Sequence, residues 1–258
     1  MKRASIMAII FTTVLIIASG CSAQHATKNY EAQQVATIPV SHASKDFLPD
    51  PNRKVVYLTF DDGPGTLTPQ VLDILDKYQV KGTFFVVGPN AKKYKDFVGR
   101  EKRDGNYVGM HSMTHDFKKL YTQGHFVNEM KEDQQIIKDI IGSEPQLCRP
   151  PFGSMPGLNQ KLRDETVNAK LKVWDWTIDS LDWKYNKVPF EKSVPTIVNN
   201  VLTHATGKRE VVLMHDIHPQ SVKALPIIIE KLREKGYDFE VYNEQAHFPL
   251  NFWRDNRL

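Results

Sequence analysis

The segment Lys54-Val55-Val56-Tyr57-Leu58-Thr59-Phe60-Asp61-Asp62-Gly63-Pro64 carries the strongest fold signal in this chain of 258 residues. Residues 55–60 are mostly β-branched, aromatic or aliphatic, which is typical of a strand buried on both faces of a parallel sheet. Two aspartates and a Gly-Pro pair follow at once, and this sequence also favours a tight turn. We therefore predict an α/β protein in which two carboxylates lie just beyond a buried strand.

Strand and helix patterns alternate along the rest of the chain. We predict strands at residues 55–60, 83–87, 107–110, 146–148, 172–178, 211–214 and 239–242. One predicted helix begins at Thr68, which we expect to cap it. Another covers part of 90–103, and the remaining predicted helices are 128–141, 158–169, 196–203 and 222–235. This alternation predicts a parallel sheet with helices outside it. About seven such units favour a distorted or incomplete (β/α) barrel, with a flat doubly wound sheet as the alternative.

The first 52 residues are predicted to be a targeting segment and a linker. Residues 1–20 combine Lys2 and Arg3 with a short apolar run, which is typical of a secretory signal and too short to span a bilayer comfortably. The following Cys21 completes a sequence that resembles the lipobox of bacterial lipoproteins, in which this Cys is lipidated. Residues 21–52 are polar, so we expect a tether to a domain at 53–258. The alternatives are an ordinary signal peptide and an N-terminal strand on the domain.

These features predict an extracytoplasmic protein that is lipid-anchored to the bacterial cell membrane and faces the cell wall. The formal net charge is +4, and it becomes +2 once the two charges of Lys2 and Arg3 are subtracted. Such a small charge predicts no nucleic-acid partner. The sequence also predicts no obligate protein partner.

Unusual polar residues follow several predicted strands. They are Asp61, Asp62, His111, His115, Arg149, Asp179, Asp182, His215 and Asp216. In a (β/α) barrel the carboxyl ends of the strands form one rim, and active sites lie there. The fold prediction therefore brings these residues together at one site.

A metal site is one chemistry that this set could support. His111 and His115 have the i, i+4 spacing that would place two imidazoles on one face if the segment forms a helical turn. Two solvated loop histidines are the alternative. Two imidazoles and one carboxylate form an open zinc set with a position left for water. Asp61 and Asp62 are neighbours on an extended segment, so their side chains should point differently. One could bind the metal and the other could act as a base.

Two further segments could assist such a reaction. Residues 149–153 read Arg149-Pro150-Pro151-Phe152-Gly153, a stiff loop that could aim a backbone N–H at an oxyanion. A rigid connector is the alternative. His215 ends a strand, and a nearby carboxylate would orient it and raise its basicity, as suits a general acid. A buried structural histidine is the alternative.

Together these motifs resemble the polysaccharide deacetylase family, also known as the NodB-homology or carbohydrate esterase family 4 domain. The resemblance covers roughly residues 53–242 and rests on five motifs in the family's order. These are residues 59–64 (TFDDGP), 111–115 (HSMTH), 149–153 (RPPFG), 179–183 (DSLDW) and 213–215 (LMH). The resemblance implies a distorted (β/α) barrel that removes N-acetyl groups from N-acetylhexosamine polymers.

The resemblance also implies a role for each matching residue. The metal ligands, for one divalent ion such as Zn²⁺ or Co²⁺, would be Asp62, His111 and His115. The catalytic set would be Asp61 as the base, Arg149 as the residue that orients it, His215 as the acid with Asp182 as its partner, and the N–H of Phe152 at the oxyanion. Trp183 and Leu213 would shape the pocket around the sugar and the acetyl methyl.

The substrate is predicted from location. A lipoprotein outside the cell membrane meets peptidoglycan first, so its N-acetylglucosamine is the leading hypothesis. Some relatives acting on muramic residues replace the second Asp of the first motif with Asn, and Asp62 argues against that group. Chitin oligomers, an exopolysaccharide and O-acetyl esters of xylan-like chains stay open. A non-catalytic sugar-binding lipoprotein is the competing class.

Overall fold

The computed structural model describes residues 53–258. The predicted signal peptide at 1–20, the predicted lipidation site Cys21 and the predicted tether at 21–52 lie outside the described residues. Within the described part of the chain, no helix is long and apolar enough to cross a membrane.

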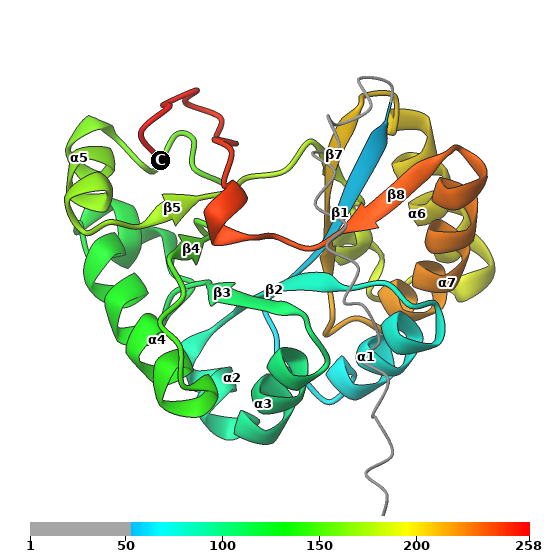
Figure 1. Cartoon of the computed structure of the whole chain (residues 1–258), viewed down its shortest axis with the longest axis horizontal. Helices are drawn as coiled ribbons and strands as arrows, with labels where there is room; N and C mark the ends of the chain where they lie inside the picture. Colours follow the sequence, from blue (N-terminus) through cyan, green and yellow to red (C-terminus); the bar gives the residue numbers. More distant parts are fainter. Residues whose placement is uncertain (1–52) are drawn as a thin grey trace, which may run out of the picture. The chain divides into compact units, whose positions relative to one another are not determined.

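The sheet is curled, and every pair of neighbouring strands in it is parallel (Figure 1). Its order is β5-β4-β3-β2-β1-β7-β6, and β8 also pairs with β1. Within residues 53–258 the strands are β1 (Lys54–Asp61), β2 (Gly82–Val86), β3 (Tyr107–Met110), β4 (Leu147–Cys148), β5 (Lys172–Val173), β6 (Ile178–Asp179), β7 (Arg209–His215) and β8 (Tyr237–Glu240). The prediction of an incomplete (β/α) barrel is confirmed.

One predicted strand is wrong, because residues 172–178 form two short strands at opposite ends of the sheet. β5 pairs with β4, and β6 pairs with β7. Between them Trp174 forms a bridge with Leu250 of the C-terminal tail, and the Thr177 N–H donates to the carbonyl of Val211 at 2.9 Å. This segment therefore crosses the gap between the two ends of the curled sheet. Most of its residues are β-branched or aromatic, so their pattern reads as one strand.

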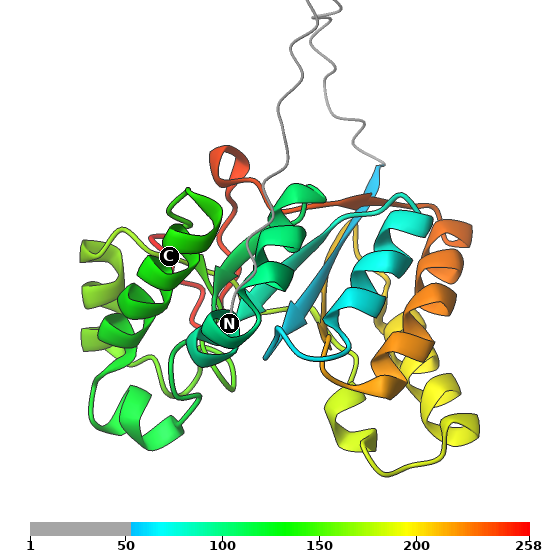
Figure 2. The same ribbon diagram turned by 90° about the horizontal axis from the view of Figure 1, so that it is seen from below.

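The helices lie on the outer side of the sheet, as Figures 1 and 2 show from two directions. They are α1 (Thr68–Lys77), α2 (Gly88–Lys93), α3 (Lys95–Arg103), α4 (Phe126–Ile141), α5 (Gln160–Asn168), α6 (Phe190–His204) and α7 (Pro219–Glu234), with shorter turns η1 (Lys118–Thr122), η2 (Asp182–Tyr185) and η3 (Glu244–Ala246). The end of α4 agrees with the prediction, because Gly142 caps it in a left-handed conformation at φ 73°.

Thr68 does not cap α1, in contrast to the prediction. It is the first residue of the helix, and the position before it, Leu67, offers no side-chain cap. The Thr68 hydroxyl instead donates to the buried carboxylate of Asp216. The Thr68 hydroxyl therefore bonds a residue distant in the sequence and not the backbone at the start of its own helix.

Alternation along β1 sorts its side chains onto the two faces of the sheet. Val56, Leu58 and Phe60 join the large apolar core beneath the helices. Tyr57 faces the other way and joins a smaller aromatic cluster with Trp174. Because side chains alternate along a strand, Asp61 lies on the same inner face as Tyr57.

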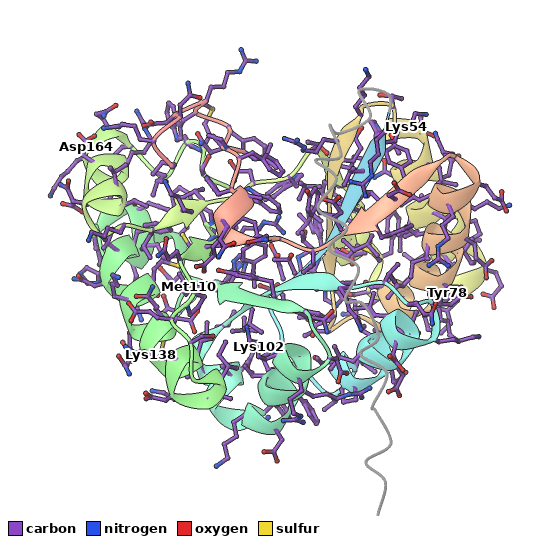
Figure 3. The ribbon with its side chains drawn as sticks, viewed as in Figure 1. Lys54, Tyr78, Lys102, Met110, Lys138 and Asp164 are labelled. Atoms are coloured by element: carbon purple, nitrogen blue, oxygen red, sulfur yellow. The ribbon has the colours of Figure 1, made fainter. Side chains whose placement is uncertain are left out.

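In Figure 3, Lys138 and Asp164 lie on the outer helices and Met110 lies near the centre of the domain.

Candidate active site

A pocket of about 460 Å³ lies where the strands end. It is lined by Asp61, Asp62, His111, His115, Phe152, Trp176, Asp179, Trp183, Leu213 and His215. Eight of the ten site residues predicted from the sequence are in this lining. The other two, Arg149 and Asp182, are fully buried and contact Asp61 and His215 from behind. The structure therefore brings all ten together.

The guanidinium of Arg149 is fully buried and makes four hydrogen bonds. Its Nη1 donates to Asp61 Oδ1 at 2.8 Å and to the Thr59 hydroxyl at 2.6 Å. Its Nε and Nη2 donate to the carbonyls of Trp174 and Asp175 at 3.0 and 2.8 Å. Arg149 thus holds one oxygen of Asp61. The other carboxylate oxygen of Asp61, Oδ2, faces the pocket and lies 3.7 Å from His111 Nε2.

Asp62 meets two imidazoles in the pocket. Its Oδ1 lies 3.4 Å from His111 Nε2 and 3.3 Å from His115 Nε2, and the three donor atoms all fall within 4.8 Å of one another. A backbone φ of 70° at Asp62 turns this side chain away from the direction that the strand would give it. Burial raises the pKa of Asp62, but the hydrogen bond and charge of His111 outweigh it and hold the pKa well below its usual range.

These three donors fit a divalent cation. His111 Nδ1 lies 2.8 Å from the carbonyl oxygen of Arg149, so this nitrogen donates its proton and leaves Nε2 directed at Asp62. Burial lowers the pKa of His111, but Asp61 and Asp62 outweigh it and raise the pKa overall. A cation that binds here would therefore displace a proton. One carboxylate and two imidazoles leave a fourth position open.

The two histidines converge through a loop and not through the helical turn that their spacing allows. Ser112 and His115 both have positive φ, 74° and 47°. The Ser112 hydroxyl accepts the His115 N–H at 3.1 Å, which closes the loop. Such backbone conformations cost free energy and persist only when surrounding structure imposes them.

Two acids of α4 impose this loop conformation, and the sequence interpretation missed both. Glu129 Oε2 accepts the N–H groups of Met113 and Thr114 at 3.1 and 2.9 Å. Asp133 Oδ2 accepts the N–H of His111 at 2.9 Å. Both carboxylates lie on the buried face of the helix. Acids at i and i+4 among the apolar positions of 128–141 were the available signal, because a buried carboxylate needs partners.

On the other side of the pocket, His215 is paired with a buried carboxylate. Its Nδ1 lies 2.7 Å from Asp182 Oδ1, and its N–H donates to Asp182 Oδ2 at 2.8 Å. Its Nε2 faces the pocket, 3.8 Å from Asp62 Oδ2. Burial lowers the pKa of His215, but Asp182, with smaller effects from Asp61 and Asp62, raises it to about 9. The free protein therefore keeps this imidazole protonated at neutral pH.

Phe152 forms the wall next to His115. Its φ is 67°, and its ring meets the His115 ring at 4.6 Å between centroids. A fully buried carboxylate, Asp175, holds the loop from behind by accepting the Ser154 N–H at 2.8 Å and the Phe252 N–H at 2.6 Å. The Trp253 indole also donates to the Ser154 carbonyl at 2.9 Å. The C-terminal tail thus supports the loop that carries Phe152.

Asp216 follows a strand as predicted but does not line the pocket. It is fully buried and accepts the Thr68 hydroxyl. A Cβ atom added to Gly63 would clash with the buried carboxylate of Asp216, so glycine is required at this close approach. Asp216 therefore fixes the turn that follows Asp62.

Comparison with known proteins identifies the family of this chain. A model of the polysaccharide deacetylase family matches residues 49–174, which include the three donors of the candidate metal site. A peptidoglycan-N-acetylglucosamine deacetylase of Bacillus cereus is 60% identical over 206 residues, 80% of this chain and 76% of that protein. This chain belongs to the polysaccharide deacetylase family.

Solved structures of the polysaccharide deacetylase family share this fold. The crystal structure of the polysaccharide deacetylase Bc1974 from Bacillus cereus is 60% identical, with a TM-score of 0.79, and the match covers 80% of this chain and 100% of that chain. The peptidoglycan-N-acetylmuramic acid deacetylase PdaC of Bacillus subtilis is 37% identical over 211 residues, 81% of this chain and 42% of that protein. Relatives are thus named for two different sugars.

The first prediction concerns the support of the histidine loop. Glu129→Gln should weaken Zn²⁺ binding by about 10–100-fold, the range typical of groups that orient metal ligands. The reason is that the amide keeps the shape but loses the charge that two N–H groups share. Calorimetric titration of metal-stripped protein measures this. Glu132→Gln, on the exposed face of the same helix, is the matched control. Equal Zn²⁺ affinity in both variants would contradict the prediction.

The second prediction concerns the imidazole of His215. Asp182→Asn should lower its pKa from about 9 toward the ordinary value of about 6.5, because burial then acts without the main opposing charge. An NMR titration of the metal-free variant measures the pKa directly. A pKa that stays near 9 would show that Asp61 and Asp62 alone maintain the charge.

Proposed function

We propose that this protein removes N-acetyl groups from the N-acetylglucosamine of peptidoglycan and releases acetate. The observation that carries the proposal is the arrangement around one three-donor set. Asp61, held by Arg149, lies on one side of the set, and His215, held by Asp182, approaches it from another. Amide hydrolysis needs such a base and a separate acid.

A divalent cation, Zn²⁺ or a similar ion such as Co²⁺, would be held by Asp62, His111 and His115. The support is the donor set itself, its closeness and the orientation of His111 through its Nδ1. When bound, the cation would supply Lewis-acid polarisation of the acetyl carbonyl and acidify water at the open position.

Asp61 is proposed as the general base. Its Oδ1 is occupied by Arg149, so Oδ2 is the oxygen that can accept a proton from water in the pocket. The buried guanidinium fixes the carboxylate in one rotamer and leaves its basic oxygen beside the metal donors. Orientation of this kind is what makes a base effective within hydrogen-bond reach of the water.

His215 is proposed as the general acid. The amine of a cleaved amide is a poor leaving group unless it is protonated. The charge of Asp182 keeps His215 protonated, and the Nδ1 contact to Asp182 leaves Nε2 to deliver the proton to that nitrogen. Base and acid thus remain separate groups with separate partners.

The remaining groups would bind the reacting sugar. The N–H of Phe152 would donate to the oxyanion of the acetyl group, a role that a backbone donor performs whatever its side chain. Leu213 and Trp183 line the same pocket and would contact the acetyl methyl and the sugar face. Leu213 is 4% exposed and Trp183 is 45% exposed, so the methyl would enter the dry end of the pocket.

We further propose that residues 1–20 direct export and that lipidated Cys21 anchors residues 53–258 through the tether at 21–52. The support is the lipobox-like sequence, together with the peptidoglycan for which the relative is named, which lies outside the cell membrane. Mass spectrometry of the membrane-bound protein would detect the acyl chains, and a mature protein without lipid would contradict the anchor.

The third prediction tests the acid and base. Asp61→Asn and His215→Ala should each lower the rate of acetate release by about 10²–10⁴-fold, the usual contribution of such groups, while the bound zinc is retained. Metal analysis of each variant accompanies the assay. His204→Ala removes an exposed histidine of α6 and is the matched control. A near-wild-type rate in either test variant would refute the assigned roles.

The fourth prediction tests the substrate. Metal-loaded protein should release acetate from purified peptidoglycan faster than from chitin oligomers of equal N-acetyl content. Mass spectrometry of the digested wall should find the lost acetyl on glucosamine and not on muramic acid, because Asp62 is present. Acetate from chitin oligomers alone would favour that alternative. A protein that binds sugars but binds no metal and releases no acetate would instead be a sugar-binding lipoprotein.

A further inference from the structure

Two exposed phenylalanines continue the pocket beyond His115. The side chain of Phe152 is 55% exposed and that of Phe117 is 43% exposed. Their ring centroids lie 5.9 Å apart, and Phe152 in turn lies 4.6 Å from the His115 ring. An aromatic surface thus runs from the candidate metal site outward, and the proposed reaction uses only the backbone of Phe152.

This surface is braced from below. The ring of Phe117 packs against Tyr121 at 5.0 Å, and Tyr121 is 6% exposed. The Tyr121 hydroxyl donates to the carbonyl of Pro151 at 2.7 Å, which ties the segment of Phe117 to the loop of Phe152. The two rings therefore belong to one supported unit. Contiguous exposed apolar groups, unlike single ones, are typical of ligand-binding surfaces.

The chemistry of the occupant follows from continuity with the pocket. A hexosamine polymer presents an apolar C–H face and polar edges at each ring, and aromatic side chains bind such faces. The same pocket is lined by Trp183, which is proposed to contact the reacting sugar. A glycan whose reacting sugar lies between Trp183 and Phe152 has its next sugar over one of the two flanks. The Phe117 flank offers an exposed platform there.

We propose that Phe117, together with the ring of Phe152, forms a subsite for the sugar next to the one that loses its acetyl group. The occupant is a second hexosamine of the same glycan chain. This proposal rests on the proposed function for the position of the reacting sugar. It predicts that affinity grows when the substrate is long enough to cover Phe117.

The fifth prediction uses binding without turnover. In the Asp61→Asn background, Phe117→Ala should raise the Kd for the N-acetylglucosamine tetramer by about tenfold, the size expected when one aromatic contact is lost. Phe117→Trp should restore the affinity, because it restores the aromatic face. Ile227→Ala removes an apolar side chain that is 39% exposed on α7 and serves as the matched control. Calorimetry gives the Kd values.

A second readout separates binding from a structural effect. With Asp61 intact, Phe117→Ala should lower kcat/KM for acetate release from the tetramer but leave 4-nitrophenyl acetate hydrolysis and Zn²⁺ affinity unchanged. Equal loss on both substrates would mean that Phe117 only supports the loop, and this would overturn the subsite. An unchanged Kd for the tetramer would overturn it as well.

The two proposals can fail separately. A wild-type protein that releases no acetate from peptidoglycan or from the tetramer would refute the proposed function. Tetramer binding that depends on Phe117 would still support the subsite in that case. Conversely, an active enzyme whose tetramer affinity ignores Phe117 refutes the subsite alone.

Discussion

The site depends above all on one buried, positively charged side chain, that of Arg149. The Arg149 guanidinium has no contact with water, and a charge in that position is tolerated only when paired and hydrogen-bonded. It finds its acceptors on β1, through Thr59 and Asp61, and on the crossing segment, through Trp174 and Asp175. The hydrogen bonds of this one guanidinium therefore join three stretches of chain: the loop of Arg149 itself, β1 and the crossing segment. Its own carbonyl orients an imidazole of the candidate metal site.

The same design is repeated around the pocket, because each reactive side chain has a buried partner supplied by a different element. Asp182 stands behind His215, and the acids of α4 hold the loop of His111. These partners set rotamers and protonation states before any substrate arrives. Preorganised groups of this kind need little rearrangement when charge develops during a reaction. The strained φ values at Asp62 and Phe152 are maintained by this surrounding structure.

Much of the fold was predictable from local patterns. The apolar run of β1, the helical spacing within α4 and the glycine that ends α4 are signals contained in a few neighbouring residues. The five motifs contain all ten predicted site residues, and these residues lie close together because parallel strands bring their carboxyl ends to one rim. Residues 172–178 were read as one strand because most of them are β-branched or aromatic. Nothing local shows that β5 and β6 join opposite ends of the sheet.

The sequence by itself determined which chemical groups are present and at which strand ends they lie. Only the tertiary structure decided how they are held. The spacing of His111 and His115 suggested a helical turn, but positive φ values and the carboxylates of α4 produce the convergence. Thr68 was expected to cap its own helix and instead bonds Asp216. In each case a buried polar group must find a partner in three dimensions, and that partner is set by packing and not by neighbouring sequence.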